Sequence, residues 1–437
     1  MTLRLEGAGA GIGERLTPIA AAGLFLVFAA AYFLSALLRG VTATLAPNFS
    51  AELGLNAGDL GLLAGAFFLG FSVMQLPLGS ALDRYGPRRV SIAFLLLAVV
   101  GCAAFASARS FAGLTLARAL IGVGVSAGLM APMTAFRHRF TPAAQMRANS
   151  WMLMSGSLGM VASTLPTRAL LPYLGWRGLF WAVAAAIALA LLAIAWRVPR
   201  DPPLAARSRM GGEQRTGYGA IFRHPAFIRF APLGFFEYGG LIAIQSLWAG
   251  PWLVEVSGLD ATTAARGLFV VNVSMLVAFS SWGLFVPSLY RRGWTAPGIV
   301  AVAGVLPILT LALAVVLGPA AGPWHWAAFC VSCTAIALLQ PALGLAFPAP
   351  LAGRALSAYN LVIFAGVFVL QWGLGLCIDA FRAAGWERVS AYRGAFALLA
   401  GCCALSYLWF LWRGARTTVP NVGPSTRTAH NPPPCPE

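Results

Sequence analysis

The chain has 437 residues, of which 59% are hydrophobic and only 10% are charged. Soluble chains carry about 25% charged residues, so this chain has too little polar surface to cover a water-exposed globule. All 30 basic residues are arginine, and the formal net charge is +17. Such a charge indicates a nucleic-acid binder only where the basic residues cluster on a water-facing domain, so the positions of the arginines decide the question.

Hydropathy predicts twelve membrane-crossing helices. A helix needs about 20 mostly apolar residues to cross a bilayer, and lipid leaves backbone groups no partner outside the segment itself. The runs are too long and too continuous for barrel strands. The fifth is the weakest, because Pro166 and Arg168 interrupt it. The twelve runs lie at 18–40, 58–80, 89–107, 112–136, 149–171, 178–196, 227–250, 265–288, 296–318, 324–347, 357–379 and 393–412.

The arginines mark one side of the membrane. With twelve spans both termini lie on the same side, and the segments on that side hold 21 arginines against seven on the other. This asymmetry predicts cytoplasmic termini and gives the charge a topological role, so we expect no nucleic-acid partner. The absence of lysine is typical of a GC-rich bacterial genome and favours an inner membrane. It also excludes an ATP-binding loop of the usual form.

The chain divides into two six-helix halves. Residues 197–226 are polar and rich in proline and glycine, as expected of a cytoplasmic linker. They separate residues 1–196 from residues 227–413, and the proline-rich residues 414–437 are expected to be a disordered tail. Faint repeats join the halves: Trp176-Arg177-Gly178 corresponds to Tyr392-Arg393-Gly394. Parallel repeats of this kind imply a site at their interface near the bilayer midplane.

Two motifs resemble those of the major facilitator superfamily. Helix 4 contains Leu114-x-x-x-Arg118-x-x-x-Gly122-x-Gly124. The loop after helix 2 resembles the superfamily gating signature, with Gly79, Asp83, Arg84, Gly86, Arg88 and Arg89 at the matching positions. The resemblance implies an all-α membrane protein with twelve transmembrane helices in two pseudo-symmetric bundles. The chain lacks the helix 5 Gly-Pro pair typical of drug antiporters.

Arg39 is the first candidate for substrate binding. Ionisable groups inside a span cost roughly 2.5–3.5 kcal/mol on insertion scales, so each invites a functional reading. Tyr32 and Ser35 fall within about 40° of Arg39 on a helical wheel, and a guanidinium suits a carboxylate because it binds in two-pronged fashion. The stretch from Arg39 to Gly54 also resembles the organic anion:cation symporter branch, in which a helix 1 arginine contacts the substrate carboxylate. The alternative is an arginine that extends to the outer interface.

Arg118 and Glu237 are the other two ionisable residues inside spans. Arg118 matches the helix 4 arginine of the superfamily, which implies either a structural role or proton coupling. Glu237 lies in helix 7 beside Tyr238 and Gly239-Gly240, which favour a helix that bends. An apolar environment favours the protonated carboxyl, so Glu237 is a candidate for proton coupling. Pairing with a substrate amine and a purely structural role remain open.

Uncharged polar residues complete the predicted site. Some line a cavity and others link helices, and the sequence does not separate these roles. The candidates for substrate binding are Tyr238, Gln245, Trp248, Asn272, Gln340, Asn360 and Gln371. No cysteine or histidine cluster indicates a metal, and no cofactor is expected.

These features predict a secondary transporter rather than an enzyme. We expect a monomer in the lipid bilayer that moves a small organic anion or amino-acid-like solute by proton-coupled alternating access. An exporter of metabolites or drugs is the alternative within transport. A polytopic membrane enzyme or a sensor that binds without flux are alternatives from other classes.

Overall fold

The computed structural model describes residues 18–199 and 218–416. These described residues are almost wholly helical and contain no strand. Most of the predicted linker and all of the predicted tail after residue 416 lie outside them, whereas residues 414–416 belong to the last helix. The first half contains α1 (Pro18–Leu53), α2 (Ala57–Val73), α3 (Gln75–Tyr85), α4 (Pro87–Ser107), α5 (Phe111–Val125), α6 (Met130–Arg139), α7 (Pro142–Ala162) and α8 (Leu165–Arg197).

The second half begins with α10 (Tyr218–Phe222) and a seventh crossing built from short consecutive segments. These are α11 (Pro225–Leu233), η1 (Gly234–Tyr238), α12 (Gly239–Ala243), η2 (Ile244–Trp248), α13 (Ala249–Pro251) and η3 (Trp252–Val256). The later crossings are α14 (Ala261–Arg291), α15 (Ala296–Ala303) with α16 (Val305–Leu317) and η4 (Gly318–Ala320), α17 (Pro323–Cys333) with η5 (Thr334–Leu338) and α18 (Leu339–Leu345), α19 (Ala349–Ala383), and α20 (Arg388–Arg416).

The crossings match the predicted twelve. Ten helices of the described chain are long and apolar enough to span a membrane, and the bent pair α2–α3 makes eleven. The remaining crossing, the fifth in chain order, consists of α7 and the first part of α8. Helix α7 ends at Ala162, and Pro166 then occupies the first turn of α8, where its missing N–H costs little. Gly175 has a φ of 62° inside α8 and separates the end of crossing five from crossing six.

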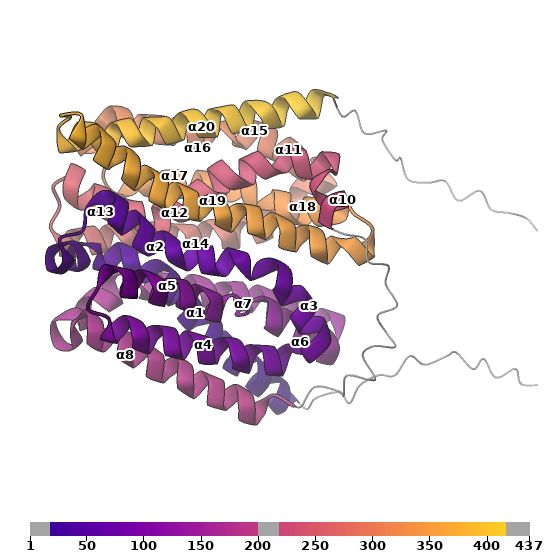
Figure 1. The fold of residues 1–437 in the computed structure, drawn as a ribbon. Coiled ribbons are helices and arrows are strands. Elements are labelled where there is room, and N and C mark those ends of the chain that lie inside the picture. The colour runs from indigo at the N-terminus through magenta and orange to yellow at the C-terminus, as the bar shows by residue number, and fades with distance from the viewer. Residues whose placement is uncertain (1–17, 200–217, 417–437) are drawn as a thin grey trace, which may run out of the picture.

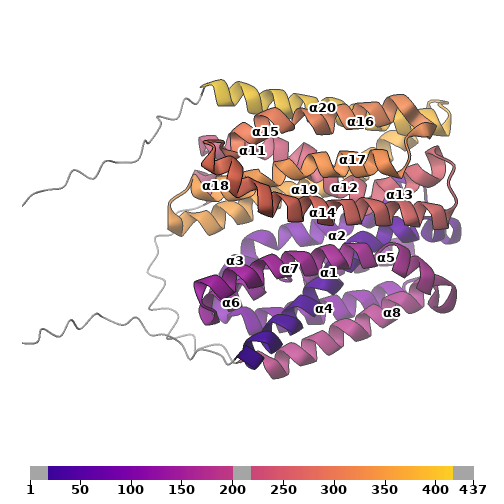
Figure 2. The same cartoon turned by 180° about the vertical axis from the view of Figure 1, so that it is seen from behind.

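The two halves lie side by side as two helical layers (Figure 1). The start of α1, the end of α8, the start of α10 and the end of α20 all lie at one end of the bundle (Figures 1 and 2). We call this the termini end and the other the far end. An even number of crossings requires this arrangement.

Helices α2 and α19 share the most extensive contact among the described elements, and it joins the halves. Gly61 permits the approach, because a Cβ there would stand 2.3 Å from the backbone oxygen of Gln371. At the far end the carboxylate of Asp379 accepts hydrogen bonds from the backbone N–H groups of Ala57 (3.2 Å) and Gly58 (2.6 Å). One half thus caps a helix of the other, and a carboxylate at a helix N-terminus is stabilising.

Candidate functional site

Arg39 lies in the middle of α1 and not near its end. The helix continues to Leu53, so Arg39 is 14 residues, or about 21 Å, from that end at 1.5 Å per residue. The predicted end at residue 40 was therefore too early. Residues 41–53 contain polar side chains that bond to protein: the Thr44 hydroxyl donates to the backbone oxygen of Ser163 at 2.8 Å. An arginine at this depth is too far from the far end to reach water there along the helix.

The guanidinium of Arg39 lies between the halves against two phenyl rings. Its central carbon is 5.6 Å from the centroid of Phe71 in α2 and 5.9 Å from that of Phe364 in α19. The Nε atom is buried without a hydrogen-bond partner, and no ion pair of Arg39 occurs among the described residues. Cation–π contacts stabilise the charge only partly, so this arginine retains hydrogen-bonding capacity.

An aromatic cluster surrounds that charge. The rings of Phe71 and Phe364 are 4.5 Å apart, and Phe68 stacks on Phe364 at 6.2 Å. These phenylalanines were not among the predicted site residues. The run Phe67-Phe68-x-x-Phe71 was visible in helix 2, but nothing in the sequence predicted that Phe364 would meet it.

Two tyrosines lie near Arg39, whereas Ser35 points elsewhere. Tyr238 interacts electrostatically with both Tyr32 and Arg39, and so faces α1 from the second half. Tyr32 is buried, and its ring packs on Gly156. The Ser35 hydroxyl is directed to the backbone oxygen of Val125 in α5, at 3.5 Å. The structure thus brings three of the predicted residues, Tyr32, Arg39 and Tyr238, to one place between the halves.

Glu237 faces the interior of the second half. It is 1% exposed, and neither carboxyl oxygen has a hydrogen-bond partner. Its electrostatic neighbours include Cys333, Cys403 and Tyr359 of three other crossings. It lies in η1, one of three π-helical turns in the seventh crossing, and such turns are frequent at functional sites. No ion pair joins Glu237 to Arg39.

The amide side chains link helices in pairs. Gln245 donates to Asn272 at 2.8 Å and Gln340 donates to Asn360 at 2.5 Å. Gln371 donates to the hydroxyl of Ser246 at 2.9 Å, and the indole of Trp248 donates to the backbone oxygen of Gln371 at 3.1 Å. Trp248 and Gln371 are both 0% exposed. In this conformation these contacts serve packing between crossings seven, eight, ten and eleven.

Arg118 is held by neighbours on α1 through Nη1 and Nη2, and only its Nε atom is buried without a hydrogen-bond partner. It is 1% exposed, donates to the backbone oxygen of Leu38 at 3.1 Å and donates to the hydroxyl of Thr42. Its guanidinium also lies over Phe67. No carboxylate is paired with it among the described residues. The geometry favours the structural reading of this residue.

The motif after α2 forms a turn at the termini end. Gly86 has a φ of 82°, a conformation that other residues rarely adopt, and it joins α3 to α4. Arg88 donates to the backbone oxygen of Ala195 at 2.5 Å. Burial raises the pKa of the nearby Tyr218 hydroxyl, while Arg354 lowers it and Asp83 raises it. Asp83 of the first half and Arg354 of the second therefore both lie within electrostatic range of Tyr218. The other motif residues, Gly79, Arg84 and Arg89, lie on the same α3–α4 segment.

A metal site is not evident in the described chain: no group of three or more His, Cys, Asp or Glu side chains there is arranged to hold an ion.

The sequence model of the Major Facilitator Superfamily matches residues 28–370. The chain belongs to this family, which confirms the predicted family and its all-α fold. It is therefore a multi-pass membrane protein of that superfamily.

Curated relatives are transporters and resistance proteins. The chain is 29% identical over 218 residues to a chloramphenicol resistance protein of Streptomyces lividans, covering 50% of this chain and 55% of that one. It is 23% identical to a probable sulfoacetate transporter of Cupriavidus necator, covering 60% and 64%. It is 24% identical to a probable L-galactonate transporter of Escherichia coli, covering 61% and 59%. The matches thus span less than two thirds of each relative.

Solved structures share the fold over nearly the whole chain. A bacterial homologue of the human lysosomal transporter Spinster, inward-facing and occupied, superposes with a TM-score of 0.72 at 18% identity, covering 92% of this chain and 98% of that one. A D-xylose–proton symporter gives 0.69 at 15% identity, covering 90% and 97%.

Proposed function

We propose that this protein is a secondary transporter that carries a small organic anion, with Arg39 as the anion-binding residue. The observation that carries the proposal is the unsatisfied guanidinium between the halves, buried at Nε and flanked by Phe71 and Phe364. A carboxylate or sulfonate supplies the acceptors that the protein does not. Sulfoacetate and L-galactonate, named for two relatives, are both anions.

Tyr238 and Tyr32 complete the proposed site. Tyr238 interacts electrostatically with both Arg39 and Tyr32, and its hydroxyl can donate to a second oxygen of the bound solute. The amide pairs, Ser35 and Trp248 act in this proposal by holding the crossings that carry these residues. They bind solute only if the pairs open in another conformation.

Proton coupling is assigned to Glu237. An unpartnered carboxyl group at 1% exposure is stable only when protonated or when water or a cation reaches it. Its position in a π-helical turn supports a role in which the seventh crossing changes register as the proton leaves. We do not assign it to a substrate amine, because its electrostatic neighbours lie within its own half.

Alternating access would follow from rocking of residues 1–196 against residues 227–413, across the linker 197–226. The protein would act as a monomer in the inner membrane with its termini end in the cytoplasm. The bond between Asp379 and the start of α2 would then open and close on the outer side. The region around Tyr218, which lies within electrostatic range of Asp83 of the first half and Arg354 of the second, would do the same on the inner side.

Uptake into vesicles tests the proposal. Purified protein in proteoliposomes, with an inward proton gradient, is offered labelled sulfoacetate, galactonate and a neutral sugar. We expect uptake of an anion, its loss in Arg39→Ala, and loss of gradient-driven accumulation in Glu237→Gln. The exposed Arg109→Gln removes the same charge without touching the site and should transport normally. If Arg39→Ala and Glu237→Gln both transport the true substrate like wild type, the proposal fails.

Export of an aromatic or drug-like solute is a second candidate. The chloramphenicol resistance protein is similar to this chain over half its length, and the Phe68–Phe71–Phe364 cluster offers an aromatic surface. Proton-driven expulsion of chloramphenicol from preloaded vesicles, without uptake of any anion tested, would favour this function over the first.

A further inference from the structure

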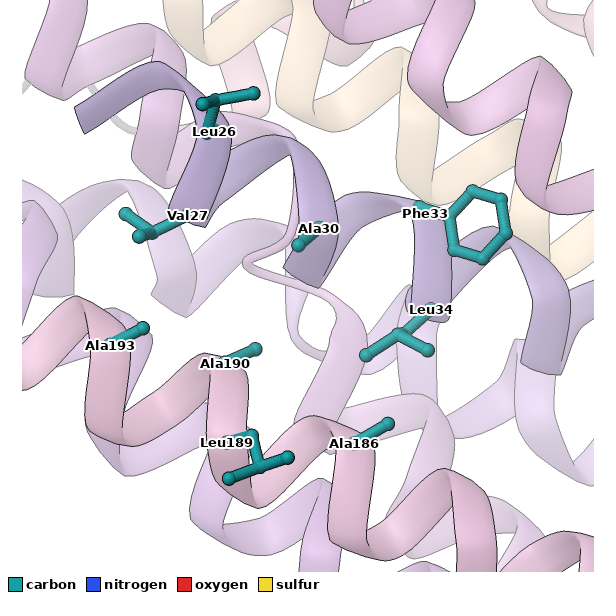
Figure 3. Close-up of a pocket in the computed structure, with 9 residues that line it drawn as sticks. All are labelled: Leu26, Val27, Ala30, Phe33, Leu34, Ala186, Leu189, Ala190 and Ala193. Atoms are coloured by element: carbon teal, nitrogen blue, oxygen red, sulfur yellow. The ribbon is translucent and has the colours of Figure 1, made fainter. Parts of the chain in front are cut away.

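An apolar groove runs along the outside of the first half between α1 and α8. This open groove has a volume of about 440 Å³, and all nine residues that line it are apolar (Figure 3). Leu26 and Leu189 on its rims are 62% and 68% exposed. The two helices therefore leave space between them on a surface that faces the bilayer. The solute site described above lies between the halves and does not include this groove.

The groove follows one regular stripe on each helix. Val27, Ala30 and Leu34 line it on α1, and Ala186, Ala190 and Ala193 line it on α8. The spacings of three and four residues keep each set on one helical face. Because three of the four α8 positions on this stripe are alanine, α8 supplies little side-chain volume to fill the space.

The next position along the two stripes brings a charged side chain to the end of the groove. One turn further toward the termini end, the stripes reach Gly23 on α1 and Arg197 on α8. A Cβ at Gly23 would stand 3.4 Å from Nη1 of Arg197, so the guanidinium closes that end of the groove. The adjacent Trp196 is 80% exposed, and its ring lies 4.7 Å from the Arg197 guanidinium carbon. Tryptophan and arginine at the end of a span are typical of the interface with lipid headgroups.

More positive charge surrounds the end of α8. Arg88 donates to the backbone oxygen of Ala195 and Arg139 donates to that of Pro199, at 2.5 and 3.1 Å. An apolar groove that ends in an arginine cluster matches one class of ligand in a membrane, namely a lipid with an apolar tail and an anionic phosphate. Basic pockets between transmembrane helices bind such headgroups.

We propose that the α1–α8 groove is a binding site for an anionic phospholipid, with an acyl chain along Ala186–Ala193 and the phosphate at Arg197. The guanidinium fork is suited to phosphate. With the termini end in the cytoplasm, the bound lipid belongs to the inner leaflet. The proposal stands on the groove and on Arg197, and does not depend on the transported solute.

Lipid retention measured by native mass spectrometry tests this site. The full chain, purified and delipidated, is titrated with phosphatidylglycerol or with phosphatidylcholine of the same chains. We expect saturable retention of phosphatidylglycerol in preference to phosphatidylcholine, and no competition by inorganic phosphate at equal concentration. Arg197→Gln should lower phosphatidylglycerol retention by roughly fivefold, the factor that one arginine near an anionic surface contributes. Ala186→Phe should block the groove and lower retention of both lipids.

Matched variants separate the site from general effects. Arg291→Gln removes one exposed arginine at the same end of the other half, and Ala185→Phe adds a ring to the exposed neighbouring face of α8. Both should retain phosphatidylglycerol like wild type. Equal retention of the two lipids, or wild-type retention by Arg197→Gln, overturns the proposal. Since Arg197 is exposed, its variant tests the site even if Ala186→Phe does not fold.

Discussion

Arg39 and Arg118 are the same residue type in neighbouring spans, yet their surroundings differ. Both guanidinium groups lie over phenyl rings. Arg118 is 1% exposed, and the Nε atom of each arginine is buried without a partner. Arg118 nevertheless donates through Nη1 and Nη2 to Leu38 and Thr42, whereas Arg39 makes no hydrogen bond to another described residue. An arginine inside the bilayer is structural where the next helix supplies acceptors, and available to a ligand where it does not.

The two arginines are also mechanically connected. The acceptor of Arg118 is the backbone oxygen of Leu38, the residue directly before Arg39. Arg118 therefore holds α1 at the point from which Arg39 projects toward the second half. On this view one arginine fixes the position of the other, and substitutions at the two sites should fail in different ways.

Arg118→Lys should have the largest effect, on stability. A lysine keeps the charge but cannot reproduce the two-pronged contact with Leu38 and Thr42. Leaving a buried charge short of partners should lower the free energy of unfolding by about 2 kcal/mol. Detergent-solubilised protein unfolded by heat or denaturant provides the measurement. Unchanged stability would mean that Arg118 is not the anchor that the geometry indicates.

Arg39→Lys is the matched change and should act on transport. The ammonium retains the charge and loses the planar fork, so uptake of the anion should fall about tenfold, equivalent to roughly 1.4 kcal/mol of binding. The free energy of unfolding should stay within about 0.5 kcal/mol of wild type. Concentration-dependent uptake in proteoliposomes separates affinity from rate. A variant that unfolds as readily as Arg118→Lys would remove the distinction between the two sites.

Asp379→Asn should shift the balance of conformations at the far end. The carboxylate caps the positive end of α2 from the other half, and this charge contributes about 0.3–1 kcal/mol. Its loss should raise the population that is open at the far end by up to about fivefold. Spin labels at Arg109→Cys and Ala384→Cys report the distance between the halves there. Glu387→Gln, an exposed acidic change in the same region, should leave the distance distribution unaltered.

Ser35→Ala should have the smallest effect. Its hydroxyl is 3.5 Å from the backbone oxygen of Val125, a long hydrogen bond, and it points away from Arg39. We expect the free energy of unfolding to change by less than about 0.5 kcal/mol. The uptake of the anion should change by no more than the factor to which that energy corresponds. A large loss of uptake in this variant would mean that Ser35 contributes to the solute site after all.

The seventh crossing shows a limit of predicting side-chain directions from a regular helical period. Trp248 was among the predicted substrate-binding residues, and a wheel of 100° per residue places it about 20° from Glu237. However, π-helical turns interrupt that periodicity at η1 and η2. A π turn closes with bonds to the fifth residue and shifts every later side chain. Trp248 consequently lies wholly inside the protein, bonded to Gln371. The adjacent glycines predicted flexibility, but not this change of register.

The length of the first helix exposes a similar limit. Thr42, Thr44 and Pro47 lower the hydropathy after residue 40, so a lipid-based criterion ends the span there. In the fold, Thr42 and Thr44 face protein partners and the helix continues to Leu53. Hydropathy identifies segments that are apolar enough to face lipid. It therefore underestimates the length of a helix that other helices surround.

Composition and pattern alone determined the family, the twelve crossings and the residues whose burial is costly. These follow from local quantities: apolar length, proline and glycine positions, and charge inside spans. Only the tertiary structure decided which costly residue was satisfied, because that depends on neighbours far away in the chain. Such neighbours are Phe364, whose ring contacts Arg39, and Leu38, whose backbone oxygen accepts from Arg118. Arg197, which reaches Gly23 at the end of the α1–α8 groove, is a third. A hydrogen bond requires atoms within about 3 Å of one another, and sequence spacing does not encode that distance between crossings.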